Sequence, residues 1–310
     1  MSADLAADTA VRADPDHPHR YHLTLPDHWD YLMPSGGVVM TCALRAAEAA
    51  LGSPVHRLAS ATTIFCAPLR SGPLVADVAV LRRGGSTAQV RVALRNVPAE
   101  NKPAPGEGGE AGSGAADDAG LELLVTFCRD RKGPDVIGAA FPSTVRPLAD
   151  APDALDDSAN NPHTRLRFYH QLDCRIADGD RWWAGGLAAG PARYARWLRY
   201  KVPQRDAEGR LDRLALPPLI DTMPTALHRA IGPGGYRFYA PSLDLTTHVV
   251  DDTRREWLLV AATVRRARAG WAIAEAEVWD DEGRFLAFGT QAMYLHGLSG
   301  EPPIIDASGR

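Results

Sequence analysis

Apolar and polar residues alternate along several stretches of the chain, and a period of two is the pattern of strands with one buried face. The alternation is clearest in LVADVAVL, AQVRVALR, WLLVAATVRR and AIAEAEVW. A helical period precedes the first group, in GGVVMTCALRAAEAALG, where apolar residues share one stripe at Val39, Cys42, Ala43, Ala46 and Leu51. The pattern predicts an α+β architecture in which a curved antiparallel sheet wraps around one helix.

The same order of elements occurs twice. Shifting the chain by 184 residues places the Thr62–Thr63 pair on Thr246–Thr247 and Arg45 on Arg229. Internal repetition at a fixed offset indicates two units of one fold. Two such units in tandem would join their sheets and bury edges that would otherwise be exposed.

Composition marks the boundaries of these units. The stretch 101–120, NKPAPGEGGEAGSGAADDAG, contains almost nothing to bury, which predicts a surface loop. The stretch 143–164 is rich in proline and polar residues and predicts a connection. We therefore expect a disordered tail at 1–19, a first unit at 20–142 that includes the loop at 101–120, a linker at 143–164, a second unit at 165–297 and a C-terminal tail at 298–310.

The overall composition is that of a folded, cytoplasmic protein. The 310 residues are 45% hydrophobic and 23% charged, with a net charge of −4 and no basic stripe, so nucleic acid is an unexpected partner. The first residues are polar and no long apolar run follows, so we expect neither a secretory signal nor a membrane span. The four cysteines form no Cys-x-x-Cys pair, and a histidine cluster near the start is more typical of solvated surface, so we expect no metal site.

One carboxylate, Asp221, stands among apolar residues in LALPPLIDTMPTALHRA. One interpretation is helix capping, since aspartate accepts hydrogen bonds from the free N–H groups of a first turn and Pro224 is tolerated there. The other is chemical, because a partly buried carboxylate can orient and deprotonate a water. Asp221 alone does not decide between them.

The order of helix, Thr-Thr strand and LVADVAVLRRGGSTAQVRVALR resembles the hotdog fold, and two copies in one chain resemble the acyl-CoA thioesterase II group of double-hotdog enzymes. The resemblance covers most of residues 20–297. The first half also resembles thioesterase-like relatives in its GG-x-x-x-x-x-ALRAA helix, which contains Gly36, Gly37 and the run from Ala43 to Ala47.

The resemblance implies a site in the second unit. Thioesterase II enzymes hold a water with an aspartate, a threonine and a glutamine, and the matching positions here are Asp221 in PPLIDTMPTAL, Ser242 in PSLDLTTHVV and Gln291 in GTQAMYL. Serine keeps the hydroxyl but not the methyl, and whether Ser242 or Thr246 supplies the hydroxyl stays open. Singly, Ser242 is typical of a turn and Gln291 of a structural amide; together, at matching places in a repeated fold, the three favour a water-holding site.

The expected activity is hydrolysis of an acyl-CoA thioester by direct attack of a bound water. The chain has no G-x-S-x-G motif, which disfavours a serine hydrolase of the α/β type. Asp221 would act as the base, and a helix beginning near Thr222 would supply N–H donors for the oxyanion. No cofactor is implied, since coenzyme A is part of the substrate. The alternative is a non-catalytic protein that binds acyl-CoA; a dehydratase is disfavoured because no histidine and carboxylate pair occupies the matching positions.

The first unit provides an internal control, because the shift places Gly37 on Asp221 and Leu58 on Ser242. We therefore expect one active site per chain, with Ser35 and glycines at the start of the first helix in place of a carboxylate. We also expect at least a dimer of chains with two-fold symmetry.

Two further groups have an ordinary and a functional interpretation. Aromatic residues of the second unit could form core or line an acyl channel: Trp182, Trp183, Tyr194, Trp197, Tyr200 and Trp257. Basic residues in PARYARWLRYK are predicted to share one strand face, which is either solvated or in contact with the phosphates of coenzyme A: Arg193, Arg196, Arg199 and Lys201.

Overall fold

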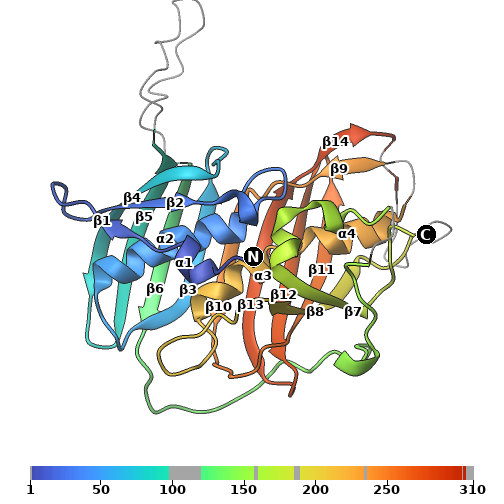
Figure 1. Cartoon of the computed structure of the whole chain (residues 1–310). Helices are drawn as coiled ribbons and strands as arrows, with labels where there is room; N and C mark the ends of the chain where they lie inside the picture. Colours follow the sequence, from blue (N-terminus) through green and yellow to red (C-terminus); the bar gives the residue numbers. More distant parts are fainter. Residues whose placement is uncertain are drawn as a thin grey trace, which may run out of the picture.

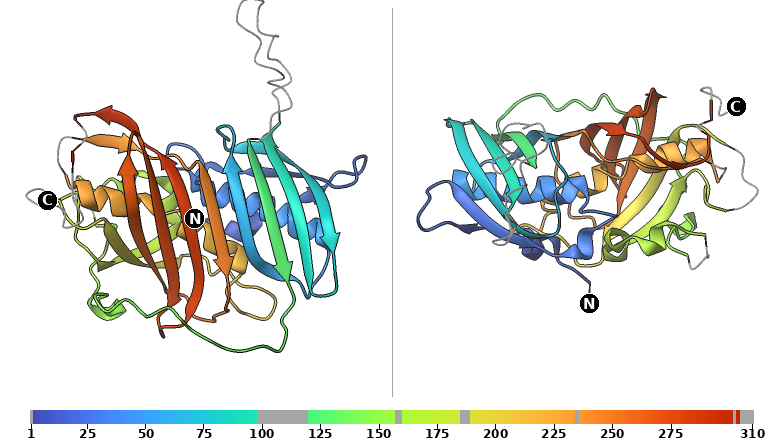
Figure 2. Two further views of the ribbon diagram at one scale, coloured as in Figure 1. Left: turned by 180° about the vertical axis from the view of Figure 1, so that it is seen from behind. Right: turned by 90° about the horizontal axis from the view of Figure 1, so that it is seen from above.

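The computed structural model describes residues 2–97, 120–156, 160–184, 189–233, 236–301 and 303–304. These residues form a 12-stranded sheet with its main helices on one face (Figure 1). The strand order is β1-β2-β4-β5-β6-β3-β10-β13-β12-β11-β8-β7. Seen from behind and from above, the sheet curves around the helices in both halves (Figure 2).

Each half supplies its own helical segment and strands. The first half contains β2 (Arg20–Leu25), α2 (Gly36–Leu51), β3 (Arg57–Phe65), β4 (Gly72–Arg83), β5 (Thr87–Asn96) and β6 (Leu121–Cys128). The second contains β7 (Leu172–Asp178), β8 (Arg193–Tyr200), α3 (Leu216–Ile220), α4 (Pro224–Ile231), β10 (Asp244–Val249), β11 (Leu258–Arg268), β12 (Trp271–Asp280) and β13 (Phe285–Tyr294). The predicted tandem α+β architecture is confirmed.

Helix α2 is buried on more than one side because it lies between the sheet and α3. The fully buried residues include Val38, Met40 and Leu44, so the buried surface of the helix is wider than a single apolar stripe. The helix ends at Gly52, whose φ of 55° lies in the left-handed region that glycine adopts without strain.

A local two-fold axis relates the halves. Strands β3 and β10 lie side by side at the centre of the sheet, and Thr62 pairs with Thr246. The hydroxyl oxygens of these two threonines are 3.0 Å apart. Their separation of 184 residues is the offset of the sequence repeat, so the repeat is confirmed by the pairing.

The predicted disordered tail at 1–19 is wrong for the described residues 2–19. They contain α1 (Leu5–Asp8) and β1 (Arg12–Ala13), and Leu5 is fully buried. The Ala3 and Ala6 N–H groups donate to the side-chain oxygens of Gln171 and Gln204, at 2.8 and 3.0 Å. Buried leucine and satisfied backbone groups tie this segment to the second half, which its acidic composition does not reveal.

The remaining elements are short. Strands β9 (Arg237–Tyr239) and β14 (His296–Ser299) form a separate pair, and 3-10 turns occur at Asp27–Trp29, Leu148–Asp150, His163–Arg165, Arg167–Gln171 and Arg213–Ala215. The predicted loop at 101–120 lies outside the described residues except for Gly120. In the described ranges, no helix is long and apolar enough to cross a membrane.

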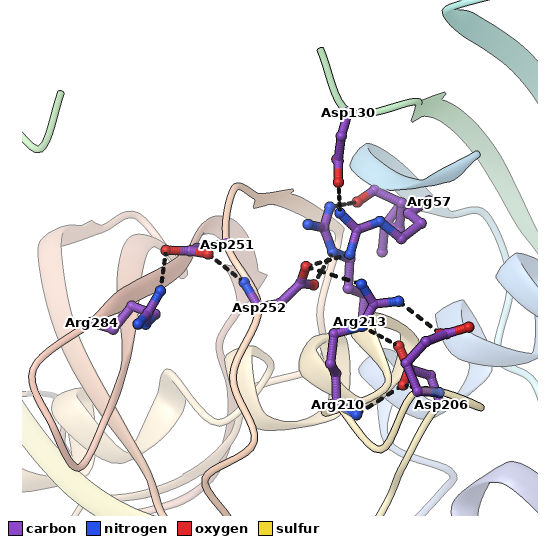
Figure 3. Close-up of polar contacts among 10 residues, drawn as sticks. Arg57, Asp130, Asp206, Arg210, Arg213, Asp251, Asp252 and Arg284 are labelled. Carbon is purple, nitrogen blue, oxygen red and sulfur yellow. Dashed lines mark hydrogen bonds and ion pairs between the residues drawn. The ribbon is translucent and has the colours of Figure 1, made fainter. Parts of the chain in front are cut away.

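A network of charges joins the halves at one end of the sheet (Figure 3). Arg57 of the first half contacts Asp252 of the second, and Arg213 donates to Asp252 at 2.8 Å. Arg57 also pairs with Asp130 at 2.5 Å, and Arg210 approaches Asp252 at 3.8 Å. Partial burial raises the pKa of Asp252, but hydrogen bonds from Arg213 and Arg57 outweigh this, so the pKa lies below its usual value.

Asp252→Asn should lower the free energy of unfolding by about 1–3 kcal/mol, because Arg57 and Arg213 would lose a charged partner. The matched control is Asp251→Asn next to it, since Asp251 and Arg284 are both exposed and such pairs contribute about 0–1 kcal/mol (Figure 3). Urea unfolding at neutral pH measures both. Ionised Asp252 stabilises the fold at pH values above the usual carboxyl pKa. This stabilisation should be lost as the pH falls through the lowered pKa of Asp252. Equal effects of the two variants would contradict a role for the network.

Candidate active site

Asp221 lies in the turn between α3 and α4 and is 4% exposed. The helix expected to begin near Thr222 is α4, which begins at Pro224, and a separate short helix, α3, ends before it at Ile220. A proline there has no N–H to donate to the Ile220 carbonyl, and its ring would clash with that carbonyl, so the helix is interrupted.

Four donors surround the Asp221 carboxylate. Oδ2 accepts hydrogen bonds from the Ser35 hydroxyl and the Gly37 N–H, both at 2.9 Å. Oδ1 accepts from the Ser242 hydroxyl at 3.0 Å and from the Gln291 amide at 2.6 Å. An ionised carboxylate accepts about four hydrogen bonds, so protein groups occupy all the acceptor positions of this buried side chain.

The carboxylate does cap a helix, but not its own. Gly37 is in the first turn of α2, so Asp221 occupies the amino end of the helix of the other half, where the helix dipole favours negative charge. The expectation that the first helix uses Ser35 and glycines in place of a carboxylate is therefore corrected. Ser35 and Gly37 instead donate to the carboxylate that the second half supplies.

The structure brings Asp221, Ser242 and Gln291 together. Ser242 forms a bridge with Met293 of β13, which places its hydroxyl 2.6 Å from the Gln291 amide nitrogen. Thr246, the alternative hydroxyl, pairs with Thr62 across β3 and β10 instead. Among the two candidates, Ser242 is the hydroxyl that contacts the carboxylate.

Burial raises the pKa of Asp221 above its usual value. The hydrogen bonds from Gly37, Ser35, Ser242 and Gln291 favour the ionised form and oppose this shift, but the desolvation of the charge is larger. A carboxylate with a raised pKa is a stronger base than an ordinary one, which suits proton abstraction from water.

Asp221 and Ser242 line a cavity of about 1180 Å³ between the halves. Gly36 also lines it, and a Cβ at this position would lie 3.2 Å from the Ser242 hydroxyl oxygen and 3.3 Å from Asp221 Oδ2. The absent side chain keeps open the space beside both polar groups. A substrate carbonyl and a water therefore have room next to the carboxylate.

Two of the six predicted channel aromatics line the cavity, Trp182 and Trp183. Trp197 belongs to a separate apolar cluster with Trp279, while Tyr194 and Tyr200 are in the main core. Trp257 lies against the guanidinium groups of Arg175 and Arg199. The sequence alone did not distinguish the aromatic residues that line the cavity from those in the core.

The prediction that the basic residues of β8 share one face is wrong. Arg196 is 2% exposed and donates to the Tyr169 hydroxyl at 2.9 Å and to the Thr225 hydroxyl at 3.0 Å. Arg193 and Arg199 point the other way and pair with Asp178 and Asp173. Residues three apart in a strand alternate faces, so Arg196 supports the turn after Asp221 rather than a phosphate surface.

Sequence reasoning missed Ser35 and Gly37 as partners of Asp221. A signal was present, because the 184-residue shift places Gly37 on Asp221. Equivalent residues of two units meet where they lie near the local two-fold axis, as Thr62 and Thr246 also do.

One 12-stranded sheet built from two repeats, each wrapped around its own helical segment, defines the class of the protein as a double hotdog. Family models of the acyl-CoA thioesterase N-terminal domain and C-terminal domain match residues 25–102 and 144–295. The chain belongs to the acyl-CoA thioesterase family. This membership supports a thioester hydrolase as the class of enzyme.

Solved structures show the same fold at low sequence identity. A hotdog-fold protein from Alicyclobacillus acidocaldarius is 19% identical, with 98% of this chain and 100% of that chain covered and a TM-score of 0.75. A putative thioesterase from Novosphingobium aromaticivorans is 23% identical, with 93% and 99% covered and a TM-score of 0.69. An acyl-CoA thioesterase II from Mycobacterium marinum is 18% identical, with 96% and 100% covered and a TM-score of 0.68. A comparison with curated protein sequences finds no match.

Proposed function

We propose that the chain hydrolyses acyl-CoA thioesters by direct attack of a water that Asp221, Ser242 and Gln291 hold. The observation that carries the proposal is a buried carboxylate with a raised pKa, hydrogen-bonded to both other groups, on the wall of a large cavity. Acyl-CoA is the proposed partner, and we propose a cytoplasmic homodimer or higher oligomer that uses no cofactor.

In the proposed reaction the water oxygen bonds to the thioester carbonyl carbon while its proton passes to Asp221. The four acceptor positions of the carboxylate are occupied, so one donor must turn away to admit this proton. The Ser242 hydroxyl lines the cavity and can rotate toward the water, which frees one acceptor position on Asp221 Oδ1. Collapse of the oxyanion then breaks the C–S bond, and the proton held by Asp221 passes to the leaving thiolate, which yields coenzyme A and the free acid and restores the carboxylate.

The donor proposed for the oxyanion is the Gly36 N–H rather than the helix near Thr222. The Thr225 and Ala226 N–H groups of α4 already donate to the Thr222 and Met223 carbonyls. Gly36 is the first residue of α2 and lines the cavity, and its N–H has no hydrogen bond within the described part of the chain. A free N–H at a helix start beside the carboxylate suits a developing negative charge.

Thiol release from an acyl-CoA panel, from acetyl to palmitoyl, tests the proposed function. Saturable cleavage by purified protein is the expected result. Tight acyl-CoA binding without released thiol would instead support the alternative, a non-catalytic acyl-CoA-binding protein. The Ser242 hydroxyl in place of a threonine is the feature that favours this alternative.

The activity should have an acidic limb set by Asp221. The base works only when ionised, so kcat/KM should fall as the pH drops through its pKa, which lies above the usual carboxyl value, and should level off at higher pH. Initial rates across pH measure the limb, with circular dichroism at each pH as the control for folding. A flat profile in the folded range would contradict the role of Asp221 as base.

A further inference from the structure

The cavity continues along α4 away from Asp221, and His228 lines this distal part. His228 lies four residues after Pro224, the first residue of α4, so at about 1.5 Å per helical residue it is roughly 6 Å along this helix from the turn that holds Asp221. Trp182, Trp183 and His163 line the same region. We refer to His228 and these three residues as the distal wall.

Both faces of the His228 ring are covered. The ring stacks on Trp182 at a centroid distance of 4.7 Å and on Phe238 at 4.2 Å, with interplanar angles of 12° and 17°. His228 is nevertheless partly exposed and lines the cavity. The ring edge, which carries the two nitrogens, is therefore the part that an occupant of the cavity can reach.

The His228 nitrogens have no hydrogen-bond partner among the described residues, although the ring is held firmly in place. Burial lowers the pKa of His228 to about 4, so the ring is neutral near pH 7. A neutral imidazole offers one N–H donor and one nitrogen acceptor. It can thus hydrogen-bond a hydroxyl or a carbonyl oxygen in the cavity.

The other three residues of the distal wall offer no polar atom to a ligand. Both ring nitrogens of His163 and the indole nitrogens of Trp182 and Trp183 are buried without partners in the described chain. These atoms are closed off by neighbouring rings, as the edge contacts between His163 and both tryptophans show, so only His228 is available to a ligand. A saturated chain in the cavity would leave the His228 nitrogens without a hydrogen bond, which costs free energy.

We propose that the cavity selects acyl groups of medium length that carry a hydroxyl or keto oxygen near their far end, and that the His228 ring edge recognises this oxygen. The inference rests on the proposed function, because it takes the thioester carbonyl to lie at Asp221. It assigns His228 to substrate specificity and not to the reaction itself.

The test compares 8-hydroxyoctanoyl-CoA with octanoyl-CoA, which differ only in the terminal hydroxyl. The wild-type protein should show a kcat/KM about tenfold or more higher for the hydroxylated substrate, as expected for one hydrogen bond to a buried group. His228→Phe keeps a ring between Trp182 and Phe238 but removes both nitrogens, so the ratio of the two kcat/KM values should fall to about one. His248→Phe, at an exposed position of β10, is the matched control and should keep the preference.

Equal kcat/KM values for the two substrates in the wild-type protein, or a preference that survives in His228→Phe, would overturn the inference while leaving the hydrolase intact. If no thioester is cleaved, the proposed function fails, and calorimetric binding of 8-hydroxyoctanoate and octanoate tests the distal wall by itself. Tighter binding of the hydroxy acid that is lost in His228→Phe would support the inference. Equal binding would overturn it.

Discussion

Asp221→Asn should lower turnover by roughly a hundredfold or more while the half-saturating substrate concentration changes little. The amide cannot take the proton from water, and the loss of a general base acts on the chemical step rather than on ground-state binding. Steady-state kinetics on the best substrate of the acyl-CoA panel measures both parameters.

The fold should tolerate this substitution. The asparagine oxygen can keep the hydrogen bonds from Ser35 and Gly37. The asparagine amide nitrogen would then face Ser242 and Gln291. Gln291 Oε1 is a buried atom with no partner in the described residues, and it can accept from this nitrogen when the Gln291 amide turns over. We expect a change in unfolding free energy of about 1 kcal/mol or less.

Asp130→Asn is the matched control, since Asp130 is 78% exposed at its side chain and lies in the charge network rather than at the cavity. It should leave turnover unchanged. If Asp221→Asn retains wild-type turnover on a good substrate, Asp221 is only the residue that caps α2. The assignments of Ser242 and Gln291 would then fail with it.

Gly37→Ala should lower the free energy of unfolding by about 2–4 kcal/mol. A Cβ at this position would lie 2.4 Å from the Pro217 carbonyl oxygen and 2.5 Å from the Pro218 Cα, so α2 and α3 would have to separate. Overpacking of this kind costs about 1–3 kcal/mol, and separation of the helices would also weaken the hydrogen bond from the Gly37 N–H to Asp221. Within an ordinary helix the same substitution would be stabilising by up to about 1 kcal/mol, so the sign itself is informative.

The matched control for Gly37→Ala is Gly85→Ala. An added Cβ at Gly85 would meet no atom within 4 Å. Urea unfolding of both variants should show destabilisation only for Gly37→Ala, and thiol release should fall in that variant because Asp221 moves with α3. A Gly37→Ala protein as stable as the wild type would show that α2 and α3 do not approach as closely as described here.

Local sequence pattern predicted the repeat and most of its strands, but not α1 and β1 within residues 2–19. Alternation along strands and the apolar stripe of Gly36–Leu51 report which side of one element faces the core, and neither depends on distant contacts. The 184-residue shift likewise predicted a relation that the Thr62–Thr246 pairing confirms. Asp221, Ser242 and Gln291 were assigned to one site through the resemblance to thioesterase II enzymes, not through periodicity.

Three features depended on the tertiary structure. The burial of Arg196 follows from its contacts with the Tyr169 and Thr225 hydroxyls, and the order of residues 2–19 follows from their contacts with Gln171 and Gln204. The surroundings of Asp221 follow from the close approach of α2 and α3, which places Ser35 and Gly37 against a carboxylate of the other half. Periodicity describes each helix separately, but the burial that raises the pKa of Asp221 arises only where two helices, far apart in the chain, meet at the local two-fold axis.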